Sequence, residues 1–211
     1  MTHRERADGT VRVAALLRVL SEHDPPTYLH SLRVAHLCRE IGNAMDLSES
    51  ALQELEHGAL LHDIGKIAIS QTLLQKADPL TAQEYSAMQQ HVLYGYWLLR
   101  DARGLERTAN VVLASHEWVN GAGYPHGAAG DAIPLGSRIV AVADAFDVMT
   151  QRTHYRFPRS AEDALRELER YAGTQFDRAV VAALEIALMI RELESQRLTS
   201  PAPDAIDGSK Q

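Results

Sequence analysis

The spacing of apolar residues constrains the fold more than any other feature of this 211-residue sequence. Apolar side chains recur at intervals of three and four residues, which places them on one face of an α-helix. The valine- and isoleucine-rich stretch 138–142 runs on in the same helical period, so no strand pattern competes. We predict an all-α helical bundle of about eight helices, over residues 11–20, 28–45, 50–61, 82–99, 105–115, 135–149, 161–171 and 177–193.

Polar residues at the expected helix starts support this reading. Ser48 precedes the third helix, and its side chain can accept a hydrogen bond from a free backbone amide. Thr81 with Glu84 forms a capping-box pattern, and Ser160 with Asp163 forms a similar one. These caps predict where three of the helices begin.

One domain accounts for most of the chain. A chain of this length buries one substantial core, and we place the domain at residues 11–196. Residues 1–10 and 197–211 are polar or rich in proline and small residues, so we predict disorder at both ends. Five glycines and two prolines within 120–136 predict an irregular loop.

The net charge limits the kinds of partner that the chain can bind, and the cysteine content indicates where the protein is located. The formal net charge is −7, whereas nucleic acid polymers and anionic membranes attract basic surfaces. We therefore predict neither partner. One cysteine, Cys38, and no recognisable leader peptide predict a cytoplasmic protein.

The candidate chemistry begins with two adjacent residues, His62 and Asp63. They follow an apolar helical segment, where burying both groups is costly unless a partner compensates. A divalent cation would satisfy imidazole and carboxylate together. The chain has ten histidines, and we assign neutral surface, capping or turn roles to five of them: His3, His23, His57, His126 and His154.

Further ligand candidates are individually weak. They are histidines within or at the end of predicted helices, and one aspartate in an apolar helix that needs a partner: His30, His91, His116 and Asp144. Asp147 is interpreted as a surface or capping residue. Imidazole and carboxylate donors suit manganese, iron or zinc, and a cysteine-based zinc site is excluded because Cys38 stands alone.

Taken in order, these residues form a recognisable series. The motifs are His30-Ser-Leu-Arg, Leu60-Leu-His-Asp-Ile-Gly-Lys, His91, His116-Glu-Trp-Val-Asn-Gly-Ala-Gly-Tyr-Pro125, Ile133-Pro-Leu-Gly-Ser-Arg and Asp144. Their order and spacing resemble the HD-GYP family, over about residues 24–181. The resemblance implies an HD-domain helical bundle that holds two divalent metal ions, iron or manganese, and hydrolyses cyclic di-GMP to linear pGpG, GMP or both.

The resemblance also implies roles for individual residues. Asp63 would bridge the two metals, with His30, His62 and Asp144 on one side and His91 and His116 on the other. Lys66 would contact the substrate phosphate and, with Asp63, make up the catalytic pair. Gly123, Tyr124, Pro125 and Arg156 would contact the substrate, and the Gly-Tyr-Pro loop could receive a GGDEF-domain partner.

Several positions depart from the family pattern. Ser115 stands where active members carry a second histidine, which removes one ligand of the second metal. Asn120 stands at the family's aspartate, and Thr153 replaces a phosphate-binding arginine that Arg152 would have to substitute. Pro26 replaces a glutamate that holds a third metal in some members, so we expect at most two.

These departures leave three functions open. The first is a cyclic di-GMP phosphodiesterase, with activity reduced by Ser115. The second is a catalytically inactive module that binds cyclic di-GMP or a GGDEF-type partner. The third is an HD-superfamily phosphohydrolase that acts on another nucleotide.

Overall fold

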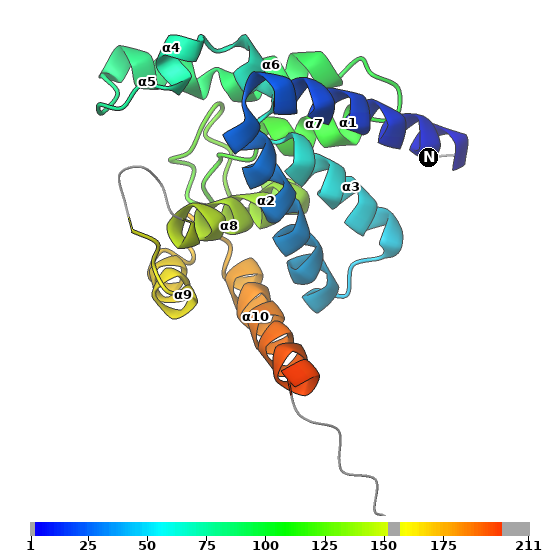
Figure 1. The fold of residues 1–211 in the computed structure, drawn as a ribbon, viewed down its shortest axis with the longest axis vertical. Coiled ribbons are helices and arrows are strands. Elements are labelled where there is room, and N and C mark those ends of the chain that lie inside the picture. The colour runs from blue at the N-terminus through cyan, green and yellow to red at the C-terminus, as the bar shows by residue number, and fades with distance from the viewer. Residues whose placement is uncertain (1–2, 152–156, 200–211) are drawn as a thin grey trace, which may run out of the picture.

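The computed structural model describes residues 3–151 and 157–199, and over these residues the fold is all-helical (Figure 1). The α-helices are α1 (His3–His23), α2 (Pro25–Ala44), α3 (Glu49–Leu61), α4 (Gln71–Leu74), α5 (Ala82–Gln89), α6 (His91–Leu99), α7 (Glu106–Leu113), α8 (Leu135–Thr150), α9 (Ala161–Arg170) and α10 (Arg178–Thr199). Two short 3₁₀ helices are also present: η1 (Ile64–Ala68) follows α3, and η2 (Gly130–Ala132) lies within the glycine-rich loop 120–136. The all-α prediction is confirmed.

The predicted caps are present. The Ser48 side chain accepts from the Ala51 amide, and Thr81 and Glu84 form the reciprocal capping box at the start of α5. The Ser160 side chain accepts from the Asp163 amide and starts α9. Each cap satisfies backbone amides that have no partner within the helix.

The structure differs from the prediction in several places: α10 runs to Thr199 rather than to residue 193, α4 was not predicted, and two further differences have visible causes. The first helix begins at His3 rather than at residue 11, and buried Gly9 packs there near the Gly104 carbonyl. The predicted helix 82–99 is divided at Gln90, whose amide bonds to the Ala87 carbonyl in a tight turn. Both differences come from tertiary or local contacts, which cannot be predicted from the spacing of apolar residues.

The helices enclose two hydrophobic clusters. The larger joins α2, α3, α8, α9 and α10 and includes Ile41, Ile139, Leu168 and Leu184, all fully buried. The smaller joins α1, α3, η1, α6 and α7 around residues such as Leu61 and Leu99. The C-terminal end of α3 lies between the clusters, and the residues that follow it are those with candidate chemistry.

The described residues contain no helix that is both long and apolar enough to cross a membrane. Both ends were predicted to be disordered, at residues 1–10 and 197–211, but residues 3–10 are helical in α1 and residues 197–199 are helical in α10. Residues 200–211, Arg152, Thr153 and Arg156 lie outside the described part of the chain. The domain limits 11–196 remain a prediction.

The larger cluster provides a test of the packing. Leu168→Ala in α9 removes a fully buried side chain, so we expect the free energy of unfolding to fall by about 2–5 kcal/mol. Leu98→Ala on α6, where the side chain is 41% exposed, should cost about 1 kcal/mol or less. Urea denaturation measures both, and equal losses would contradict this account of the core.

Candidate metal centre

His62 and Asp63 are buried at the end of α3. The Nδ1 atom of His62 donates to the Ala59 carbonyl at 2.7 Å, so in the neutral ring Nε2 is the acceptor. This Nε2 is buried and has no hydrogen-bond partner among the described residues. A buried unpaired acceptor is costly, and a cation would satisfy it.

Asp63 carries a buried negative charge that several groups compensate. Burial alone would raise the pKa of the carboxyl, but the Lys66 ammonium and the surrounding histidines hold the pKa well below its usual value. Lys66 Nζ donates to Asp63 Oδ2 at 2.6 Å. The carboxylate is therefore ionised and able to bind a cation.

The first group of candidate ligands is His30, His62 and Asp144. One ligand atom from each lies within 4.8 Å of the others. His30 Nε2 is 3.0 Å from Asp144 Oδ1. Burial opposes protonation of His30, but Asp144 and Asp147 raise its pKa to about 9. The same contact lowers the pKa of Asp144 to about 2 against the effect of burial.

The second group is Asp63, His91 and His116, with ligand atoms again within 4.8 Å. His91 Nε2 is 3.3 Å from Asp63 Oδ1 and 3.2 Å from His116 Nε2. His91 Nδ1 donates to the Met88 carbonyl at 2.7 Å, so its Nε2 faces the group unprotonated. Burial lowers the pKa of His116 to about 4, with His91 contributing. Both rings are neutral near pH 7, the form that binds metals.

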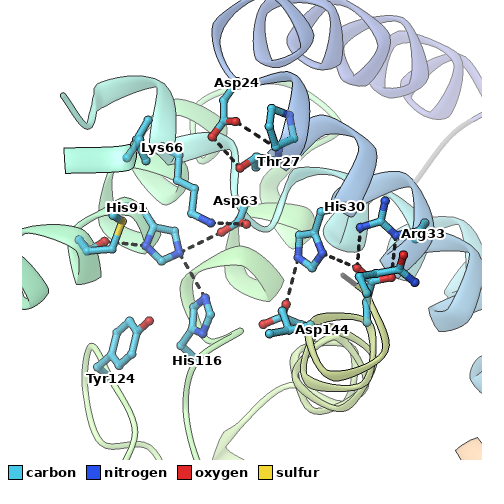
Figure 2. A pocket seen from close by; sticks show the side chains of 16 residues that line it. Asp24, Thr27, His30, Arg33, Asp63, Lys66, His91, His116, Tyr124 and Asp144 are labelled. Atoms are coloured by element: carbon cyan, nitrogen blue, oxygen red, sulfur yellow. Dashed lines mark hydrogen bonds and ion pairs between the residues drawn. The ribbon is translucent and has the colours of Figure 1, made fainter. Parts of the chain in front are cut away.

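Asp63 lies between the two groups (Figure 2). Its Oδ1 faces His91, and its Oδ2 lies 3.5 Å from His62 Nε2. The six residues that the sequence predicted as ligands are thus brought together, although they come from α2, α6, α8 and the segments after α3 and α7. Three imidazoles are fixed at Nδ1, those of His30, His62 and His91. With His116 and two ionised carboxylates they form a donor set that fits divalent cations, and a cation bound to His30 would displace its Nε2 proton.

An open pocket of about 920 Å³ lies over these groups. Two cationic side chains, Arg33 and Lys66, line it together with five of the six ligand candidates. Asp24 and Thr27 from the start of α2, Tyr124 from the glycine-rich loop and Val148 from α8 complete its edges. The pocket is large enough for a dinucleotide-sized ligand.

Comparison with known proteins agrees with this geometry. The HD domain family profile matches residues 14–180. The chain belongs to the HD domain family. It is 38% identical to a cyclic di-GMP phosphodiesterase of Thermotoga maritima, over 85% of this chain and 50% of that protein. It is 37% identical to the 3'3'-cGAMP-specific phosphodiesterase 2 of Vibrio cholerae, over 75% of this chain and 31% of that protein.

A solved structure shows the same fold. This is a cyclic GMP-AMP specific phosphodiesterase of V. cholerae, with a TM-score of 0.66 at 23% identity, over 91% of this chain and 53% of that one. The chain spans half or less of the length of these two curated relatives. The predicted resemblance to HD-GYP phosphodiesterases is confirmed at the level of the family.

Two residues that support this HD centre were not predicted to do so. Asp147 is buried, and its Oδ2 accepts from His30 Nδ1 at 2.8 Å. Arg33 holds the Asp147 carboxylate through two bonds of 2.8 and 2.9 Å. The signal in the sequence was that His30 and Arg33, and likewise Asp144 and Asp147, lie three residues apart and so share helix faces.

The Gly-Tyr-Pro loop packs against His116. A Cβ added at Gly123 would lie 2.3–2.5 Å from backbone atoms of residues 116–118, so only glycine fits. The Tyr124 amide donates to the His116 carbonyl at 3.1 Å, and the two rings stack with centroids 5.0 Å apart. Of the loop's three predicted substrate residues, the pocket lining includes Tyr124 but not Gly123 or Pro125.

The departures from the family pattern have visible structural roles. The Ser115 hydroxyl is buried and donates to the Val112 carbonyl at 2.9 Å, so it is turned back toward α7. Asn120 accepts from the Ala122 amide and shapes the loop. His57 is buried rather than on the surface, a correction to its predicted setting, and burial lowers its pKa.

Close backbone packing fixes the distance between Asp63 and His91. A Cβ at Gly65 in η1 would lie 1.9 Å from the His91 carbonyl oxygen and 2.6 Å from the Gly95 nitrogen in α6. Only glycine permits this approach. The contact fixes how far Asp63, which precedes η1, lies from His91 at the start of α6.

Gly65→Ala should therefore force η1 away from α6. We expect the free energy of unfolding to fall by at least about 1–3 kcal/mol, since a methyl group has no space there. Ser86→Ala on the exposed face of α5 is the control and should change it by about 0.5 kcal/mol or less. Thermal unfolding followed by circular dichroism measures both, and matching melting curves would refute the packing argument.

Proposed function

We propose that this chain is a metal-dependent phosphodiesterase that hydrolyses cyclic di-GMP. The observation that carries the proposal is the position of Asp63, with one carboxylate oxygen directed to each group of candidate ligands. A carboxylate shared in this way could join the two ligand groups of a two-metal hydrolytic centre. The names of the relatives support cyclic dinucleotides as the class of substrate.

The residues proposed to hold the metals are the two groups described above. His30, His62 and Asp144 would hold one cation, and His91 and His116 the other, with Asp63 shared. Divalent cations in such a site supply Lewis acidity toward a phosphoryl oxygen and stabilise charge on the leaving oxygen. Iron or manganese is the proposed identity, as the resemblance to the HD-GYP family implies, and the nitrogen and oxygen donors are compatible with both.

The chain's own groups would bind and orient the substrate. Lys66 lines the pocket, and its ammonium beside Asp63 can pair with a non-bridging phosphate oxygen. Arg33 places a second positive charge on the pocket wall, although its guanidinium is also held by Asp147. Tyr124 presents an aromatic side chain at the edge of the pocket. Gly123, Pro125 and Arg156 remain proposed substrate residues.

Ser115 favours a second candidate function. Its hydroxyl points to the Val112 carbonyl, so it adds no ligand and the second cation would have three protein ligands. A weakly held second metal would leave a module that binds cyclic di-GMP without hydrolysing it. A GGDEF-type partner would then contact the loop, where Trp118 is 37% exposed.

The substrate could also be a related nucleotide. One relative is named as specific for 3'3'-cGAMP, which differs from cyclic di-GMP in one base. The first assay should therefore compare the turnover of cyclic di-GMP with that of 3'3'-cGAMP. It should also separate linear pGpG from GMP among the products.

Turnover by protein loaded anaerobically with iron or manganese tests the function. We expect hydrolysis of cyclic di-GMP. In Asp63→Ala the turnover should fall by more than about a hundredfold, because the change removes a metal ligand itself rather than a residue that only holds a ligand in place. Asp101→Ala, an exposed carboxylate on the surface, is the matched control. Metal and nucleotide binding without hydrolysis would instead support the binding module.

Asp147 is expected to position His30 for metal binding. Asp147→Asn keeps the shape but removes the charge that anchors Nδ1, so manganese affinity measured by calorimetry should fall by about 10–100-fold. Asp177→Asn is the matched control, because Asp177 also pairs with an arginine, Arg138, at 2.6 Å. Equal affinities for the two variants would argue against the positioning role.

A further inference from the structure

Helix α10 is apolar on two opposite faces. One face carries Leu184 and Ala187, which are buried, and Leu188, which packs against the larger cluster. Arg191 on this side lies 3.5 Å from Glu40 of α2. This face is therefore covered by the chain itself.

The opposite face is exposed. Ile186 and Ile190 are each 47% exposed, Leu193 is 55% and Met189 is 60%. Exposed apolar side chains scattered singly need no explanation, but four on one helix face form a patch. Figure 1 shows the C-terminal half of α10 extending away from the other helices, so among the described residues none covers this patch.

The exposed residues follow a heptad repeat. Ile186 and Leu193 occupy a positions and Met189 a d position. Ala179 and Ala182 extend the same series toward the N-terminus, and the polar Gln196 occupies the d position that follows Leu193. This 3-4 spacing is the pattern of a two-stranded coiled coil. Ile190 falls at e and widens the seam.

Charges beside the seam specify the partner. Glu192 lies at a g position and Arg197 at the following e position. In a parallel pair of identical helices, g of one chain faces the next e of the other, so Glu192 would meet Arg197 of the copy twice by symmetry. Glu185, Glu192 and Glu194 flank the patch with negative charge, which disfavours an anionic membrane surface.

We propose that this face of α10 binds a second copy of the chain as a parallel coiled coil. Residues 200–211 contain one large aliphatic side chain, Ile206, so this segment supplies no equivalent apolar cover. The association would leave the metal centre in each subunit unchanged, since the seam lies on the face of α10 opposite the core.

Sedimentation velocity on the full chain over a concentration series tests the proposal. We expect the wild type to form a dimer, and Ile186→Glu to weaken the association by about tenfold or more because it buries a carboxylate in the seam. Val19→Glu, at a site of 48% exposure on α1, should leave the dimer intact. Circular dichroism checks that every variant is folded.

Charge reversal tests the parallel orientation. Glu192→Arg alone places a positive charge opposite Arg197 of the other copy, so it should weaken the dimer. Adding Arg197→Glu makes the two charges opposite again and should restore the dimer. A wild type that stays monomeric at every concentration would overturn the proposal and leave a partner of different sequence as the occupant. A dimer unaffected by Ile186→Glu would overturn it as well.

Discussion

The centre depends on the compensation of one buried negative charge, that of Asp63. A carboxylate 3% exposed is tolerated only where positive charge and hydrogen-bond donors surround it. Lys66 provides a direct ion pair, and the unprotonated Nε2 of His91, 3.3 Å from the other carboxylate oxygen, leaves that edge for a bound cation to satisfy. The surrounding helices are positioned so that this requirement is met, and the same arrangement forms the pocket.

Much of the fold followed from the spacing of apolar residues and from a few caps. Helices α2, α3, α8 and α9 lie within a few residues of their predicted bounds, because each combines a clear apolar face with clear end signals. The break at Gln90 was not predictable in this way. The apolar period runs through it, and the tight turn before His91 depends on local hydrogen bonds.

How much of the site could be predicted from the sequence differed from residue to residue. His62 and Asp63 stood out because adjacent ionisable groups are unusual after an apolar helix, and the ordered motifs then identified the other candidates. The role of Asp147 was missed because the sequence does not show that α2 and α8 face each other there. The contact of Gly123 with the backbone of His116 was missed for the same reason.

The candidate ligands are distant in sequence, and His30 and Asp147 are separated by 117 positions. Contacts of such long range carry the entropic cost of closing a long loop, which the packing of the intervening helices has to offset. The ligands lie on or next to helices that build both hydrophobic clusters, and Asp63 follows α3, which contributes to both. Any local opening that separates the clusters would dismantle both groups of ligands together, so the centre should exist only in the fully assembled domain.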